Sequence, residues 1–294
     1  MSVEAASPGQ PSQAAAFEFV RSLSAELSRG RVELPSFPDV VVRVRRALAD
    51  EASTVDQVVR IVGSEPALAA RLLKMSNSAM LNRSGRQVTD LRTAVNRMGH
   101  NMVRSAAISF AMAQIRAASR LQGLDGLLQS LWETSTRVAA MSFVLARKLT
   151  RLNPDEAMLV AGLLHNIGKL YIVTRAEKHP ELFSDPAFMN EVIRDWHAAI
   201  GKAILENWEF ADSMAEAIAS QDDLGRESPD AADLSDVVAA ALLIAGFMSD
   251  PQGLEVAMQG LPVTVRLGLN GEKSAAILNE SANEIANLRS ALEG

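Results

Sequence analysis

The most informative ten residues of the chain read Ala161-Gly162-Leu163-Leu164-His165-Asn166-Ile167-Gly168-Lys169-Leu170. Their apolar residues predict the end of a buried helix, where an imidazole lies directly beside a carboxamide before the chain turns at a glycine. An Asp after the His would be a strong metal signal, because both groups bind divalent ions and a carboxylate can bridge two of them. Asn166 is neutral and cannot offset the charge of such an ion. The stretch therefore predicts a helical scaffold with a weakened metal site.

The stretch resembles the His-Asp motif of the HD superfamily of metal-dependent phosphohydrolases, in particular its HDOD branch, the HD-related output domain. Every position of the typical form, Leu-Leu-His-Asp-Ile-Gly-Lys-Leu, is present here except the Asp. Three further segments resemble motifs of that branch and occur in its order: Leu34-Pro35-Ser36-Phe37-Pro38, Glu65 to Ala79, and Ala94 to Gly99. The resemblance covers roughly residues 34–250. It implies a two-lobed helical HDOD fold with an HD-like C-terminal lobe, in a bacterial signal-transduction context.

The composition is that of a globular chain able to bury a core. Of its 294 residues, 48% are apolar and 22% are charged. Cysteine is absent, which excludes disulfides and thiolate metal sites. No apolar run approaches the roughly 20 residues that a membrane span requires, and the N-terminus lacks the layout of a signal peptide. We therefore expect a cytoplasmic protein without a membrane partner.

Charge is unevenly divided along the chain. Residues 36–120 hold 13 Lys and Arg against 6 Asp and Glu, whereas residues 121–294 hold 13 against 25. Such a division is explained by two lobes that attract each other, by solvated helix faces, or by an anionic ligand on the basic lobe. The first two explanations are favoured, and the third is kept as an alternative.

Helical periodicity and helix-start signals predict an all-α fold, and the sequence shows no sustained strand alternation. Residues 1–33 are expected to be a disordered start followed by a helix over 14–28. Residues 34–122 are predicted to form the N-terminal helical lobe of an HDOD fold, and residues 123–250 the HD-like helical lobe.

The last part of the chain, residues 251–294, is predicted to be a loop and a C-terminal helix. The loop is expected over residues 251–271, with a short extended piece at 263–267, because prolines and glycines interrupt it. The closing amphipathic helix is expected over 273–292. It either docks on its own lobe or pairs with a second copy of the chain, so a homo-oligomer stays open.

Most of the metal-ligand positions that the resemblance implies are changed. The family's ligands are a His from the helix ahead of the motif, the His-Asp pair, further His residues and a late Asp. His165 and His197 are retained, whereas the other positions hold Thr134, Asn166, Ser220, Gln221 and Gly246. A catalytic ion needs three or more protein ligands and an open position. We therefore expect no metal, no cofactor and no catalytic residue, and we interpret both histidines as hydrogen-bonded core or cleft residues.

Three functions are compatible with these observations. The first is a non-catalytic signalling protein that binds a partner protein or a small effector, with a cyclic dinucleotide as one candidate implied by the resemblance. The second is a residual metal-dependent phosphohydrolase of nucleotides or cyclic dinucleotides that uses His165 and His197. The third is a binder of anionic ligands or nucleic acid through the basic lobe, although this lobe lacks aromatic stacking residues and helix-turn-helix spacing. The first is preferred, because the apolar framework persists around the changed ligand positions.

Five cations are candidates for a ligand or partner surface: Lys169, Arg71, Lys74, Arg83 and Arg86. Lys169 could contact a phosphate in an active relative. Its simpler interpretation is a charge at the negative end of a helix dipole.

Overall fold

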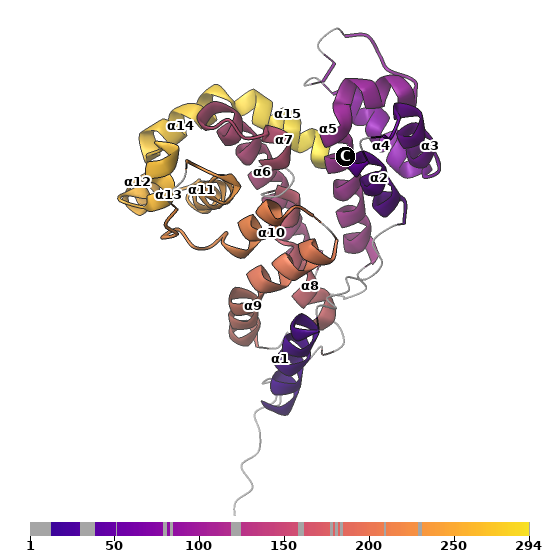
Figure 1. The fold of residues 1–294 in the computed structure, drawn as a ribbon. Helices are drawn as coiled ribbons and strands as arrows, with labels where there is room; N and C mark the ends of the chain where they lie inside the picture. The colour runs from indigo at the N-terminus through magenta and orange to yellow at the C-terminus, as the bar shows by residue number, and fades with distance from the viewer. Residues whose placement is uncertain are drawn as a thin grey trace, which may run out of the picture.

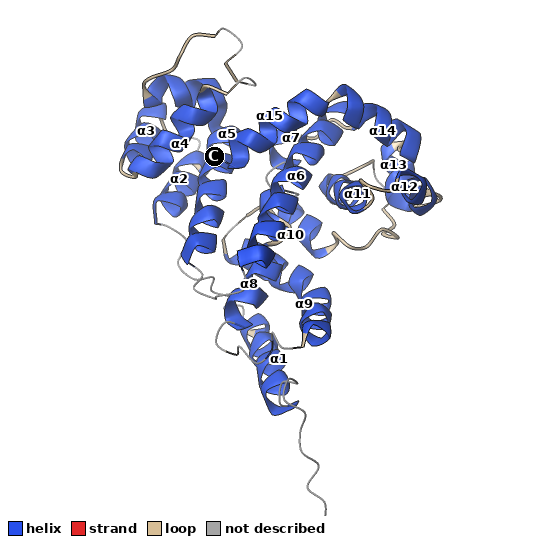
Figure 2. Cartoon of the chain, turned by 180° about the vertical axis from the view of Figure 1, so that it is seen from behind, coloured by secondary structure: helices blue, strands red, loops and turns tan. Residues whose placement is uncertain are grey.

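The computed structural model describes residues 13–29, 39–50, 52–78, 81–82, 85–118, 125–157, 162–176, 179, 182, 185–208, 210–228 and 231–293. These residues form helices and no strand, which confirms the all-α prediction (Figure 2). Several predictions fall outside the described residues: the disordered start, the Leu34–Pro38 motif, Arg83, and the expected division between the lobes at residues 122 and 123. None of the described helices combines the length and apolar character that a bilayer span requires.

The N-terminal lobe consists of α2 (Asp39–Ala49), α3 (Val55–Gly63), α4 (Pro66–Ser76) and α5 (Leu91–Ala118). Thr54 begins α3 with a capping box, in which its hydroxyl accepts from the Gln57 N–H and the Gln57 side chain accepts from the Thr54 N–H. Helix α5 is interrupted at Gly99, whose φ of 72° is costly for a residue with a side chain. The helix start and the break therefore lie where local sequence signals predict them.

The HD-like lobe begins with the long helix α6 (Asp125–Leu149) and the short α7 (Pro154–Ala157). It continues with α8 (Ile167–Ala176), α9 (Pro186–Asn207), α10 (Asp212–Ala219) and α11 (Leu234–Gly246). Helix α8 packs on α9, α9 on α10, and α10 on α11, while α11 also packs on α6. The core of this lobe therefore lies between the long helix and the later helices.

The prediction of a loop over residues 251–271 is wrong, because that segment forms α12 (Pro251–Met258) and α13 (Pro262–Leu267). Both prolines occupy the first helical turn, where the missing N–H would have had no intrahelical partner. The closing helix is also divided, into α14 (Gly271–Glu280) and α15 (Ala282–Glu293). Proline and glycine here begin and end short helices, so reading them as loop residues, with an extended piece at 263–267, was mistaken.

Both terminal helices pack on the HD-like lobe, and α15 also reaches the N-terminal lobe (Figure 1). Helix α1 (Gln13–Ser28) packs on α9 of the HD-like lobe, and its Glu26 accepts hydrogen bonds from Tyr171 and Arg175. Helix α15 packs along α6 and its end contacts α4 of the N-terminal lobe. The first helix of the chain therefore belongs to the second lobe, and the last helix ties that lobe to the first.

Candidate functional site

The His165–Asn166 pair lies between a π-helical turn over residues 162–164 and the start of α8. Close packing on α6 holds this turn, because a Cβ atom at Gly162 would lie 1.8 Å from the Cβ atom of Ala139. His165 and Asn166 are only 0% and 3% exposed. The His165 Nδ1 atom lies 3.1 Å from the Gly162 carbonyl oxygen, within its own turn. The pair is thus part of the core rather than of an open cleft.

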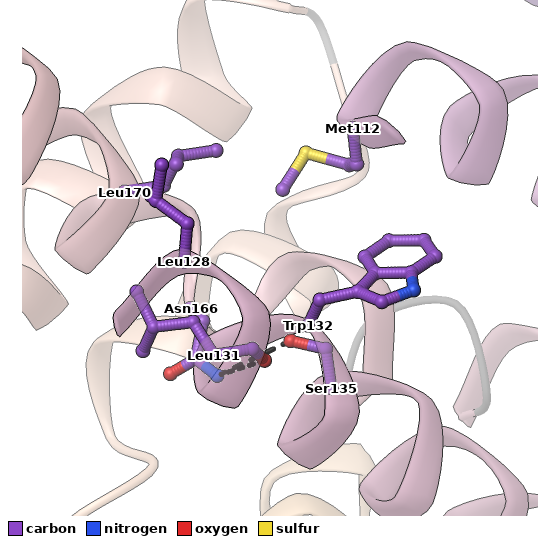
Figure 3. Close-up of a pocket in the computed structure, with 7 residues that line it drawn as sticks. All are labelled: Met112, Leu128, Leu131, Trp132, Ser135, Asn166 and Leu170. Carbon is purple, nitrogen blue, oxygen red and sulfur yellow. Dashed lines mark hydrogen bonds between the residues drawn. The ribbon is translucent and has the colours of Figure 1, made fainter. Parts of the chain in front are cut away.

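The Asn166 amide is built into the contact between α8 and α6 (Figure 3). Its Nδ2 atom donates to Ser135 Oγ at 3.2 Å and to the Leu131 carbonyl oxygen at 3.4 Å. A carbonyl oxygen only accepts hydrogen bonds, so an ionised Asp at this position could not make the second contact. The Asn166 Oδ1 atom is buried and accepts no hydrogen bond from the described residues. The position therefore suits a carboxamide, which can donate, better than a carboxylate.

A small cavity adjoins this amide and is mostly apolar (Figure 3). Its volume of about 20 Å³ is enough for one water molecule. It is lined by Met112, Leu128, Leu131, Trp132, Ser135, Asn166 and Leu170. A nucleotide cannot enter a cavity of this size.

Both ring nitrogens of His197 have a polar neighbour. The Nε2 atom lies 2.9 Å from the Asp222 Oδ2 atom, and the Nδ1 atom lies 3.4 Å from the Gln221 Nε2 atom. A neutral ring protonated on Nε2 satisfies both contacts, because it donates to the carboxylate and accepts from the amide. The same Gln221 Nε2 atom donates to the His165 carbonyl oxygen at 3.3 Å. Gln221, predicted only as a lost ligand, therefore joins the two retained histidines.

Asp222 and Lys169 add two charges at the edge of this cluster. The hydrogen bond from His197 lowers the pKa of Asp222 against the opposing effect of burial, and the nearby Lys169 charge lowers it further. Burial lowers the pKa of Lys169, and the attraction of Asp222 partly offsets this. Lys169 makes no hydrogen bond or ion pair with the residues that the structure describes. The prediction that Lys169 is a charge at the negative end of a helix dipole is wrong, because Lys169 lies in the first turn of α8, at the positive end.

Sequence reasoning did not identify Ser135 or Asp222. Each directly follows a position that was considered, Thr134 and Gln221 respectively. Thr134 itself is half-buried on α6, and Gly246 is exposed at the end of α11. Ser220 is half-buried, and its hydroxyl donates to the Glu216 carbonyl oxygen at 2.8 Å, within its own helical segment. The only available signal was proximity in sequence to the changed ligand positions.

The residues present do not fit the divalent metal centre that the resemblance implies. No group of three or more His, Asp, Glu or Cys side chains is suitably placed for a metal anywhere in the described ranges. Asn166 faces α6 with its donor nitrogen, and His197 has neighbours at both nitrogens. The chemistry of this donor set favours a hydrogen-bonded structural cluster.

Of the five cations predicted for a ligand or partner surface, the four that the structure describes do not form one cluster. Arg71 donates to Ser109 and to the Leu292 carbonyl oxygen, at the end of α15. It also lines a hollow of about 380 Å³ between α4 and α5, together with the exposed Lys74. Arg71 is therefore engaged in the tie between the lobes.

The other two described cations, Arg86 and Lys169, do not line this hollow. Arg86 is exposed on the loop before α5, and its carbonyl oxygen accepts from Arg97. Lys169 is on α8 beside Asp222, in the other lobe. In the described part of the chain, no hydrogen bond joins Lys169 to Arg71, Lys74 or Arg86, and Lys169 does not line the hollow that Arg71 and Lys74 share.

Many arginines of the basic lobe make contacts within the chain. Arg43 donates to Ser64 at 2.7 Å, and Arg92 pairs with Asp56. Other contacts join Arg45 to the Phe210 ring, Arg97 to the carbonyl oxygens of Ser76 and Arg86, and Arg104 to the Leu48 carbonyl oxygen. These contacts favour the structural explanation of the positive charge.

Comparison with known proteins agrees with this architecture. The family model for the HDOD domain matches residues 34–224. A crystal structure named "Putative metal-dependent phosphohydrolase from Shewanella amazonensis SB2B" has a TM-score of 0.72 and 28% identity, covering 95% of this chain and 100% of the other. A "Putative signal transduction protein" from Marinobacter aquaeolei VT8 has a TM-score of 0.62 and 20% identity, covering 96% and 66%.

A relative from Treponema pallidum (strain Nichols), named "Uncharacterized protein", is 23% identical over 209 residues. The match covers 67% of this chain and 39% of the relative. The chain thus corresponds to well under half of that longer protein.

Proposed function

Because the chain belongs to the HDOD domain family, we propose that it is a non-catalytic signalling protein that binds a partner protein or a small effector in a bacterial signal-transduction pathway. One observation carries the proposal. The position that would supply the bridging carboxylate is Asn166, and its amide donates to two acceptors of α6. A side chain used in this way contributes to the packing of the lobe and offers no charge to an ion.

The neighbours of Asn166 support the same function. Gln221 and Asp222 engage the two nitrogens of His197, and His165 is fully buried beside its own turn. Internal hydrogen bonds occupy the polar centre of the helical scaffold. A partner or effector would therefore bind at the surface or in another cavity. A partner protein is the preferred ligand, and a cyclic dinucleotide is the alternative effector.

A residual phosphohydrolase is the second candidate function. It is favoured by the 28% identity with the Shewanella amazonensis protein, whose name carries that activity, and by the two retained histidines. Its metal would have to displace the Asp222 carboxylate or the Gln221 amide from His197. This rearrangement is why we place the hydrolase second.

Metal content distinguishes the two functions. The protein is incubated with Mn, Fe or Zn salts, exchanged into metal-free buffer and measured by plasma mass spectrometry. We expect no more metal in the wild type than in a His165→Ala, His197→Ala double variant. We also expect no hydrolysis of a panel of nucleotides and cyclic dinucleotides.

One metal per chain that is lost in the double variant, together with turnover that depends on it, would overturn the proposal. A Lys74→Ala variant serves as the control, because this exposed residue lies in the other lobe. Its metal content should equal that of the wild type under either function.

A further inference from the structure

A second and much larger cavity lies where α6 and α11 of the HD-like lobe meet the C-terminal helices α12, α14 and α15. Its volume is about 530 Å³, within the ~300–1,000 Å³ typical of small-molecule sites. It shares no lining residue with the small cavity beside Asn166. The function of the polar cluster therefore leaves this cavity unexplained.

The walls of the large cavity are mainly apolar. Met141 contributes from α6, Phe247 follows α11, and Leu278 and Ile285 come from α14 and α15. Met248 also lines the cavity and is 53% exposed, so part of this apolar wall faces water. Removing such an apolar surface from water is favourable, so the apolar part of a ligand would be stabilised by packing against it.

Two arginines, Arg137 and Arg289, are the only charged residues among those that line the cavity. Arg137 is half-buried on α6 and makes no hydrogen bond or ion pair with any residue in the described ranges. A guanidinium group without a carboxylate partner is free to pair with an anion, which would be stabilised by charge-assisted hydrogen bonds. The cavity therefore joins an apolar wall to the unpaired charge of Arg137.

Both arginines belong to the same end of the cavity. Lys148 pairs with Glu280 and Arg147 with Glu284, so later residues of the α14–α15 segment meet earlier residues of α6. The two segments thus run antiparallel. Arg289 follows Glu284 in α15, and Arg137 precedes Arg147 in α6, which brings both cations toward one end.

We propose that this cavity binds an amphipathic anion, with an apolar chain against Met141, Leu278 and Ile285 and a single acidic head group at Arg137 and Arg289. The chemical class is a medium-chain carboxylate or alkyl phosphate. The inference rests on the proposed function in one respect, since the cavity would then be the effector site of a non-catalytic signalling protein.

Decanoate is the probe, and decanol and decyltrimethylammonium are its neutral and cationic counterparts. Binding is measured by isothermal titration calorimetry below the concentration at which each probe self-associates. We expect decanoate to bind more tightly than decanol, and the cation to bind more weakly than both. Decyl phosphate tests whether the head group must be a carboxylate.

Arg137→Met keeps the length of the side chain and removes its charge, so it should weaken decanoate binding about 10-fold to 100-fold. Decanol binding should be nearly unchanged. Arg151→Met is the matched control, because Arg151 is exposed on the turn after α6 and lies outside the cavity. Equal affinity for decanoate and decanol, or equal affinity of wild type and Arg137→Met for decanoate, would overturn the proposal.

Leu278→Trp tests the apolar part of the site by filling it. We expect this variant to lose binding of both decanoate and decanol while retaining the thermal unfolding transition of the wild type. Unchanged binding would show that the ligand lies elsewhere and would also overturn the proposal. These titrations are independent of metal content, so failure of the ligand site and discovery of a catalytic metal are separate results.

Discussion

Gly168 lets α8 pack directly on the backbone of α9. A Cβ atom added at this position would lie 1.9 Å from the His197 carbonyl oxygen and 2.8 Å from its carbonyl carbon. The atoms that block it belong to backbone inside α9, which cannot rotate away as a side chain can. Gly168→Ala therefore has to separate the two helices that carry the polar cluster.

The required movement sets the expected cost. An ordinary contact begins near 3.4 Å, so the two groups must move apart by about 1.5 Å. Alanine favours a helix over glycine by about 1 kcal/mol, whereas overpacking a well-packed core costs about 1–3 kcal/mol and sometimes more. Since the obstacle is backbone, we expect the upper part of this range to prevail, and the free energy of unfolding to fall by about 2–3 kcal/mol.

Urea unfolding followed by tryptophan fluorescence measures this change. Trp132, Trp196 and Trp208 all lie in the HD-like lobe, so the signal reports on the lobe that contains the substitution. With a urea dependence of about 2–3 kcal/mol per molar, the midpoint should fall by about 1 M. The control is Gly126→Ala, because no atom lies within 4 Å of a Cβ placed at that exposed helical position. It should be neutral or stabilise the protein by up to about 1 kcal/mol.

The two glycine variants make the reasoning refutable. If Gly168→Ala unfolds at the same urea concentration as the wild type, or at a higher one, α8 does not approach α9 as described. If Gly126→Ala loses as much stability as Gly168→Ala, the effect of Gly168→Ala cannot be assigned to its contact with the His197 carbonyl oxygen.

Three further changes test other contacts. Arg71→Met frees the end of α15, so amide hydrogen exchange over its last turn should increase by the equivalent of about 1.5–3 kcal/mol, whereas Lys74→Met on the exposed surface should leave it unchanged. The hydrogen bond from His197 lowers the pKa of Asp222, so the stability that this carboxylate contributes is complete above the unfolded pKa of about 3.9 and is lost as pH falls toward the folded value. Asp222→Asn should lack this acid dependence of the urea midpoint. An unchanged dependence would show that the Asp222–His197 contact is not its source. Asp236→Ala removes a fully buried carboxylate that pairs with two arginines; Arg266 loses its ion pair, whereas Arg226 keeps Asp233, so the free energy of unfolding should fall by about 3–5 kcal/mol, and wild-type stability would refute that role.

The polar cluster was only partly predictable. The neutrality of Asn166 is evident from the sequence, and with it the weakness of the metal site. The acceptors that hold its amide are not evident, because Ser135 and the Leu131 carbonyl oxygen lie 31 and 35 residues earlier in the chain. Asp222 is likewise found only when the segment after α10 is folded against α9.

The C-terminal segment shows that proline can mark either the end or the start of a helix. Proline ends a helix that precedes it and also begins one, because its missing N–H has no role in the first turn. At Pro251 a helix begins, because the Asp250 side chain caps it by accepting a hydrogen bond from the Gly253 N–H at 2.9 Å. A closer reading of Asp250-Pro251 as a helix start would have predicted α12.

The sequence by itself determined the helical class, the HDOD relationship and the loss of charge at Asn166. Each depends on periodicity, capping or side-chain chemistry that acts between residues a few positions apart. The tertiary structure alone decided the tie between Arg71 and Leu292, which are 221 residues apart. It also decided that Arg137 and Arg289 line one apolar cavity. The physical reason is that burial and the meeting of distant charges depend on how helices pack, and many packings satisfy the same local pattern.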